Sequence, residues 1–180
     1  AARVREAVGD ANRIWLVYDP RWETEEWTLF EYLLNEQSVY HCATLADDAN
    51  MRIWGFGRVE NFTWQFAEQI GVALLGEPNI NPERLSIWLA YQVSDQIPLN
   101  TYSVAVHLLD ENGQLVSQVD RSLPVVGTSC QALELPLYDL SSGTYELHLA
   151  IYNWQTGERL TSIAPDNTTS DYPLITLIHP

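Results

Sequence analysis

Hydrophobic and polar residues alternate along the second half of the chain, most clearly in segment 102–109. Its apolar positions Val104, Val106 and Leu108 alternate with Ser103, Ala105 and His107. Because successive side chains of a strand point to opposite faces of a sheet, this period predicts a strand with a core face and an outer face. A second strand is expected over 114–120, since Asn112-Gly113 before it is a typical hairpin turn.

A second hairpin of the same kind is expected further along the chain. Segment 143–152 is predicted to pair with segment 158–160 through the loop 153–157, which ends in Thr156-Gly157. Connections of this length that contain glycine are common hairpin loops. Two hairpins so close in sequence favour an antiparallel β-structure for this half of the chain.

Short strands are expected throughout the region after Gly57, where the helical period is lost. About eight strands, separated by turn sequences, are predicted there: 64–75, 84–93, 102–109, 114–121, 131–137, 144–152, 158–163 and 172–178. Strands of this length and spacing are typical of a β-sandwich of the immunoglobulin-like or jelly-roll kind. Residues 59–180 are therefore predicted to form a β-sandwich domain.

The first 58 residues predict a small α/β unit. The apolar run 14–18 has the length of a strand, and 24–37 is expected to be a helix because Trp27, Phe30 and Leu34 fall on one face. Two further strands are expected over 39–45 and 51–56. In this β-α-β-β order the first two strands are predicted to be parallel, with a right-handed crossover. The fold class expected for the chain is thus mostly β, with a small α/β part at residues 1–58.

Composition and charge exclude some classes of function. Hydrophobic residues make up 46% of the chain and charged residues 18%, which is typical of a globular protein. The net charge is −15, and all nine basic residues are arginine. Such a surface repels phosphate backbones and anionic lipid headgroups, so nucleic acid is not an expected partner. No apolar run approaches the length of a membrane-spanning helix.

Two cysteines, Cys42 and Cys130, lie in the two different predicted units. A disulfide between them would tie the units together and restrict the unfolded chain. Two buried free thiols fit the sequence equally well. Both alternatives stay open at this point.

Catalytic and metal-binding patterns are missing from the sequence. The four histidines, His41, His107, His148 and His179, form no metal-type pair in sequence. Nucleophile signatures and lysines for Schiff-base chemistry are absent, and Gly55-Phe56-Gly57 is a lone Gly-x-Gly with no helix after it. No catalytic residue, metal ligand or cofactor is therefore predicted.

Aromatic residues provide the positive indication of a binding role. The chain has seven Trp and nine Tyr, and Trp22 and Trp154 fall in predicted loops, where exposed rings can stack on sugars. Core packing is the competing interpretation, above all for Trp15, Trp27, Trp54 and Trp88, which lie inside predicted elements. His107 and His148 are expected to face outward on adjacent strands, which makes them further candidate binding residues.

Several of these segments resemble the C-terminal region of family 39 glycosyltransferases, the dolichyl-phosphate-mannose mannosyltransferase-like membrane enzymes, as found in Chloroflexus-type bacteria. The matching pieces are 104–121, 133–140, 143–152, 156–160 and Arg13-Ile-Trp-Leu-Val-Tyr18. Segment Ser129-Cys130-Gln131 departs from the pattern because it lacks the usual aromatic residue. In that family the catalytic acids lie in a loop between the first membrane helices, a region with no counterpart here, so no catalytic residue is carried over.

This resemblance implies an extracytoplasmic domain attached to the cell membrane through a preceding part of its parent protein. The domain is expected to be non-catalytic and to support the membrane domain of the same parent chain, or to hold an acceptor or glycan near it. An independent carbohydrate-binding module is the alternative, and a glycoside hydrolase with a hidden carboxylate pair is a third. The oligomeric state is not predicted.

Overall fold

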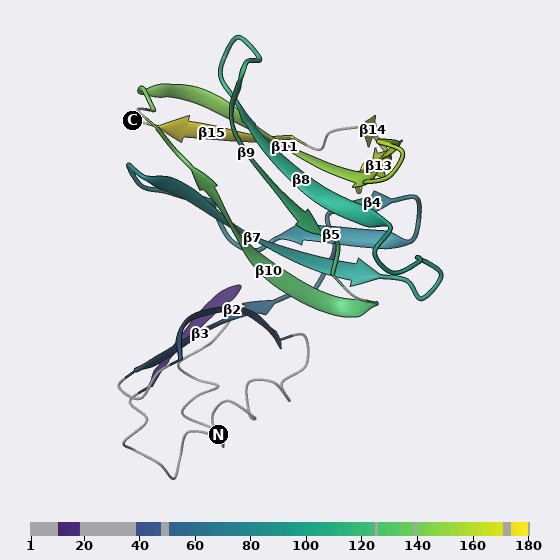
Figure 1. Cartoon of the computed structure of the whole chain (residues 1–180), viewed down its shortest axis with the longest axis horizontal. Helices are drawn as coiled ribbons and strands as arrows, with labels where there is room; N and C mark the ends of the chain where they lie inside the picture. Colours follow the sequence, from purple (N-terminus) through teal and green to yellow (C-terminus); the bar gives the residue numbers. More distant parts are fainter. Residues whose placement is uncertain are drawn as a thin grey trace.

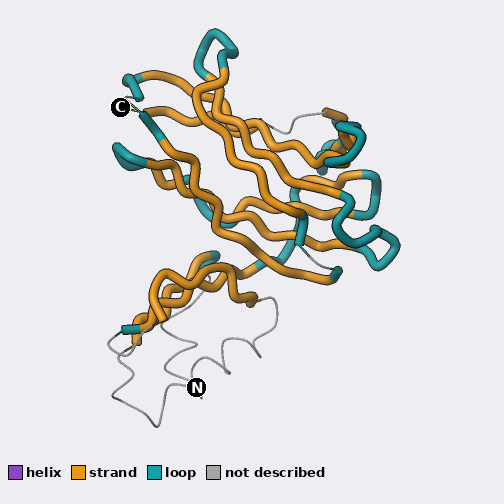
Figure 2. Tube along the Cα trace, viewed as in Figure 1, coloured by secondary structure: helices purple, strands orange, loops and turns teal. Residues whose placement is uncertain are grey.

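A computed structural model describes residues 11–18, 39–47, 51–124, 126–138, 140–170 and 174–179. The regular structure of these residues is β throughout, in three sheets that lie in successive layers (Figure 1, Figure 2). The helix expected over 24–37 lies outside the described residues. None of the described segments is a helix long and apolar enough to cross a membrane.

Sheet A is formed by β1 (Arg13–Tyr18), β2 (Val39–Asp47) and β3 (Arg52–Arg58), in the order β1-β3-β2. Both outer strands pair antiparallel with β3. As predicted, β1 and β2 run in the same direction, but β3 lies between them. The described part of the expected α/β unit is therefore an antiparallel sheet.

Sheet B is the middle layer. Its strands follow the order β10 (Gly127–Pro136), β7 (Arg84–Val93), β5 (Ile70–Leu74), β4 (Trp64–Phe66), β13 (Ser162–Ile163) and β14 (Thr169–Ser170), and β6 (Asn79–Ile80) pairs with β7. Sheet C has the order β12 (Arg159–Leu160), β11 (Gly143–Asn153), β8 (Tyr102–Leu109) and β9 (Leu115–Ser122), with β15 (Leu174–His179) also paired to β11. All the pairings described in these two sheets are antiparallel.

The main hydrophobic core lies between sheets B and C, as the predicted β-sandwich requires. Alternate residues of β7 and β8 fill it, and the most buried of these are Leu85, Ile87, Leu89, Tyr91, Val104, Val106 and Leu108. The period-two pattern of 102–109 thus identified the core face of β8 correctly. Ala105 was expected to face outward, and it does, yet only 2% of its surface is exposed.

Both predicted hairpins are confirmed, and side chains stabilise each turn. Between β8 and β9, the carboxylate of Asp110 accepts hydrogen bonds from the backbone N–H groups of Asn112 and Gln114. Between β11 and β12, the amide oxygen of Asn153 accepts a bond of 2.9 Å from the backbone N–H of Gln155. A side-chain oxygen that binds backbone N–H groups two or more residues ahead is the usual reason for Asp and Asn at such positions.

Several strands differ in their bounds from the sequence prediction, and the strand expected over 158–163 divides into β12 of sheet C and β13 of sheet B. The strand expected over 64–75 is divided into β4 and β5 by a turn, in which Ala67 has φ 49° and Glu68 has φ 59°. Nothing in their residue types signals this, because both residues ordinarily avoid the left-handed region. The strand expected over 131–137 begins four residues earlier, at Gly127, which pairs with Val93.

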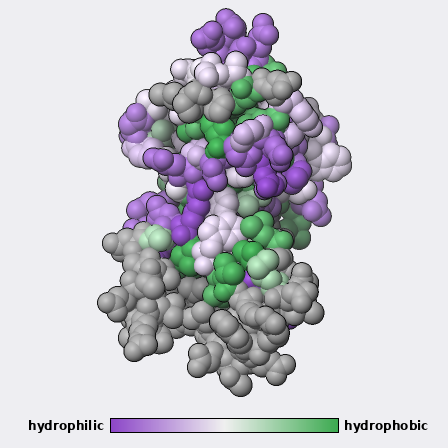
Figure 3. Space-filling model, turned by 90° about the vertical axis from the view of Figure 1, so that its left-hand side faces the viewer, coloured by the Kyte–Doolittle hydropathy of each residue, from purple (hydrophilic) through white to green (hydrophobic). Residues whose placement is uncertain are grey.

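Sheet A packs on the outer face of sheet B, and two glycines of β3 allow the close approach. A Cβ atom on Gly55 would lie 2.4 Å from Cη2 of Trp88, and one on Gly57 would lie 2.3 Å from Cδ1 of Leu75, which directly follows β5. The ring of Trp15 meets that of Trp88 edge to face, with centroids 4.8 Å apart. On the face shown in Figure 3, hydrophobic residues gather in a band below a region with many hydrophilic residues.

A disulfide joins the two layers. Cys42 of β2 is bonded to Cys130 of β10, across a sequence separation of 88 residues. The structure therefore has the first of the two alternatives that the sequence left open. The bond lies beside Val59, Ala73, Leu75, Trp88 and Ala90, which form a small buried cluster of their own between the sheets.

Candidate functional site

The outer face of sheet B carries a row of small and polar residues at one end of its strands. Strand pairing aligns Gln65 with Gly71, Gly71 with Gln92, and Gln92 with Thr128. The four residues therefore lie side by side across β4, β5, β7 and β10. They face away from the core because the neighbouring residues of β4, β5 and β7 point into it.

A groove with a volume of about 310 Å³ lies over this row. Gly71 contributes no side chain to it, and the Phe62 ring packs against this glycine: a Cβ atom added there would lie 2.9 Å from Cγ of Phe62. The described residues that line the groove are Gln65, Glu68, Gln69, Gly71, Gln92, Val93, Ser94, Gly127 and Thr128. The volume falls at the lower end of the range typical of small-molecule sites.

The turn 67–69 and the segment after β7 border this groove. The backbone N–H of Gln69 donates to the carbonyl oxygen of Phe66, and the backbone N–H of Ser94 donates to the carbonyl oxygen of Gln69. The side-chain amide of Gln69 donates to that of Gln96 at 3.3 Å. These bonds connect the β4–β5 turn to the segment after β7, so this border is fixed by the backbone.

Two glutamines of the row keep their hydrogen-bonding groups available. The side chains of Gln65 and Gln92 make no hydrogen bond to any other described residue. An amide offers two donors and an acceptor, and the hydroxyl of Thr128 offers both functions as well. Phe62 packs against Gly71 between them, so an apolar side chain lies next to these neutral polar groups. This combination suits a ligand that carries many hydroxyl groups.

The charge of the groove is negative. Glu68 is the charged residue of the described lining, and no described basic residue lines the groove. Asp95 lies next to the groove, where its carboxylate accepts a bond of 3.5 Å from the hydroxyl of Ser94. A ligand that carries negative charge would be repelled here, on a chain whose net charge is already −15.

His107 and His148 lie on the outer face of sheet C, far from the sheet B groove. The register of β8 and β11 places the two residues directly opposite each other, so the expectation that they face outward on adjacent strands is correct. Burial lowers the pKa of His107 below 6.5, and the nearby charges of Arg159 and His148 lower it further, while Asp120 acts in the opposite direction. His148 Nε2 lies 3.2 Å from a carboxylate oxygen of Glu146.

Several polar side chains of this sheet C face bind to one another. The hydroxyl of Tyr152 donates to the carboxylate of Asp120 at 2.9 Å, and this bond, after burial, raises the pKa of the phenol. The Tyr152 side chain crosses β8 to reach β9, which helps to explain why Ala105 and Ala150 are buried on this outer face. The described residues contain no group of three or more His, Cys, Asp and Glu side chains that could hold a metal ion.

Trp154 lies in the turn between β11 and β12, and 55% of its surface is exposed. Its indole N–H donates to the carbonyl oxygen of Asn100 at 2.6 Å, and its backbone N–H donates to that of Thr101 at 3.2 Å. The ring is therefore fixed against the loop before β8. It directly follows the end of β11, six residues beyond His148 and roughly 20 Å away, so Trp154 and the histidine pair do not form one site.

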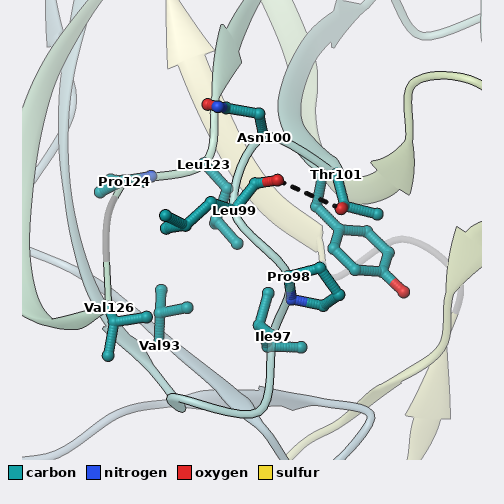
Figure 4. Close-up of a pocket in the computed structure, with 10 residues that line it drawn as sticks. Val93, Ile97, Pro98, Leu99, Asn100, Thr101, Leu123, Pro124 and Val126 are labelled. Atoms are coloured by element: carbon teal, nitrogen blue, oxygen red, sulfur yellow. Dashed lines mark hydrogen bonds between the residues drawn. The ribbon is translucent and has the colours of Figure 1, made fainter.

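The loop that holds Trp154 also lines a small apolar pocket (Figure 4). Its volume is about 30 Å³, room for a water molecule but not for a sugar. Val93, Ile97, Leu99, Leu123 and Val126 surround it, and the hydroxyl of Thr101 donates to the carbonyl oxygen of Leu99. This pocket offers too little space for a ligand site.

None of the described residues that the sequence proposed for binding lines the groove. Trp22 lies outside the described residues, while Trp154, His107 and His148 lie elsewhere on the sandwich. Sequence reasoning missed Gln65, Gln92 and Thr128 because they are far apart along the chain. A usable signal was the presence of glutamine at outward positions of two strands that are otherwise apolar.

Comparisons with known proteins give no family. No family model matches the chain, and no curated protein does. Among solved structures it is similar to a β-glucuronidase from Bacteroides uniformis, with 15% identity and a TM-score of 0.39 over 71% of this chain. It is also similar to a Bifidobacterium dentium β-glucuronidase complexed with coumarin-3-O-glucuronide, with 12% identity and a TM-score of 0.34 over 71% of this chain.

These similarities are limited in extent. The chain covers 15% of the first enzyme and 19% of the second, so it corresponds to less than a fifth of their length. At TM-scores below 0.5 they support no transfer of activity or substrate.

Proposed function

We propose that this chain is a non-catalytic accessory domain that binds a glycan in the groove on sheet B. The observation that carries the proposal is the row of Gln65, Gly71, Gln92 and Thr128, aligned across four strands beneath a groove of about 310 Å³. Neutral donors and acceptors gathered in one groove match the hydroxyl groups of a sugar.

The proposed setting follows from the resemblance of its hairpins to family 39 glycosyltransferases. In this setting the domain lies outside the cytoplasmic membrane, next to the membrane domain of its own parent chain. There it would hold a glycan or acceptor close to the enzyme. A gene in which hydrophobic helices precede this region would support the attachment, and a stand-alone reading frame would contradict it while leaving glycan binding untouched.

Binding to a panel of neutral oligosaccharides tests the groove directly. Isothermal titration calorimetry with linear glucans, mannans and xylans of different linkage should find at least one ligand with a millimolar or lower Kd. The variant Gln92→Ala should weaken that binding about tenfold, because it removes an amide from the centre of the row, a change of about 1.4 kcal/mol.

A matched control comes from the opposite side of the sandwich. Gln118 is an exposed glutamine on the outer face of sheet C, and Gln118→Ala should leave the affinity unchanged. No binding by any neutral oligosaccharide, or equal losses in both variants, would contradict the proposed site.

A further inference from the structure

The structure points to Glu68 as the residue that selects the charge of the ligand: we infer that the groove takes neutral or cationic sugars and rejects uronates. This inference rests on the proposed function and names the substrate class of the same site. Glu68 lines the groove, and the remaining side chains of the described lining are uncharged.

The backbone holds Glu68 in an unusual conformation. Ala67 and Glu68 both have positive φ, 49° and 59°, in the turn between β4 and β5. Two consecutive left-handed positions usually contain glycine or asparagine, since other residues bring Cβ close to the backbone there. An exposed carboxylate is thus kept in a turn where glycine would be less strained. Such outliers justify a functional hypothesis when a site lies beside them.

The position of this carboxylate suits recognition of hydroxyl groups. An ionised carboxylate accepts hydrogen bonds through both oxygens and donates none, whereas the amides of Gln65 and Gln92 can do both. Two adjacent hydroxyls of one sugar ring can therefore bind to Glu68 while other hydroxyls of the ligand bind to the amides of Gln65 and Gln92. An ammonium group in place of a hydroxyl would bind more strongly.

The charges at the groove repel a ligand that carries a carboxylate. No described basic residue lines the groove, and Asp95 adds a second negative charge beside Ser94. A uronate would have to approach Glu68 without a cation to balance it. Repulsion between like charges depends on salt, so this discrimination should weaken as the ionic strength rises.

Three oligosaccharides with the same β-1,4 backbone test this inference: cellopentaose, its C6-oxidised uronate counterpart, and the glucosamine pentamer of chitosan. Their Kd values would be measured by NMR titration of the wild-type chain at low salt, together with Glu68→Gln and Gln92→Ala. The uronate should bind the wild-type chain at least tenfold more weakly than cellopentaose, and the glucosamine pentamer at least as tightly. Glu68→Gln should reduce the difference between uronate and cellopentaose to less than threefold.

The outcomes separate this inference from the proposed function. If Gln92→Ala weakens binding but the uronate and cellopentaose bind the wild-type chain equally, charge selection is contradicted and glycan binding stands. The same holds if Glu68→Gln leaves the discrimination intact. If none of the three ligands binds, or if Gln92→Ala has no effect, both the groove and its selectivity are contradicted.

Discussion

The two outward faces of the sandwich, one on sheet B and one on sheet C, are built differently. Sheet A covers part of the sheet B face through a disulfide and two glycine contacts, and a groove remains open beside it. No described element packs over the sheet C face, where polar side chains bind to one another, as in the pairs Tyr152–Asp120 and His148–Glu146. The same strand alternation thus exposes amides beside a groove on the sheet B face, whereas it brings several polar side chains of the sheet C face into pairs.

This difference shows which exposed polar residues are available to a ligand. Titratable groups attract attention in a sequence, and for this reason His107 and His148 were candidates. In the structure their neighbours partly bury or bind them. Gln65 and Gln92 are chemically plain, but their side chains line a groove. In this chain, unbonded hydrogen-bonding groups beside a groove indicate a binding site better than titratable side chains do.

Removal of the disulfide should have the largest effect on the covered face. The variant Cys42→Ala/Cys130→Ala loses a cross-link that spans 88 residues of sequence, and loop-closure entropy predicts a loss of roughly 4 kcal/mol of unfolding free energy. Urea denaturation followed by tryptophan fluorescence measures this loss. A decrease of under 1 kcal/mol would show that packing alone holds sheet A on sheet B.

Substitution of a glycine between sheets A and B should have the second-largest effect on the free energy of unfolding. In Gly55→Ala the new methyl group would lie 2.4 Å from the Trp88 ring, and overpacking of this kind costs about 1–3 kcal/mol. Gly143→Ala is the matched control, since its methyl group would meet only a Tyr145 carbon at 3.8 Å. Equal unfolding free energies for the two variants would mean that the layers do not approach as closely as described.

A substitution on the outer face of sheet C should lower the free energy of unfolding less. Tyr152→Phe removes the hydroxyl that donates to Asp120, and because the freed carboxylate is exposed to water, we expect a loss of about 1 kcal/mol or less. Tyr138→Phe is a suitable control, because Tyr138 is 82% exposed. A loss above 2 kcal/mol for Tyr152→Phe would show that this face contributes more to stability than its exposure suggests.

The pH dependence of His107 should be the smallest effect. Because burial lowers its pKa in the folded state, the unfolded chain binds the proton more readily, and stability should rise with pH up to about 6.5. His107→Gln should flatten this slope without removing it. Thermal melts between pH 5 and pH 7.5 measure both chains, and identical slopes would contradict the assignment.

The sequence predicted the sandwich better than its site. Val104, Val106 and Leu108 identified a core face, and Asn112-Gly113 identified a turn, because both signals depend on residues close together in the chain. The groove depends on a register between residues 65, 71, 92 and 128, which no local pattern specifies. The division of 64–75 was missed for a related reason, since Ala67 and Glu68 are not typical of a left-handed turn.

The side-chain amide signals of the two central glutamines test the account most directly. In an NMR titration with a neutral oligosaccharide, the Gln65 and Gln92 amide resonances should shift in a saturable manner, while those of Gln118 on sheet C should not move. Such a result would place the ligand on the open row of sheet B. Shifts at Gln118 or at the indole of Trp154, with Gln65 and Gln92 unchanged, would contradict it.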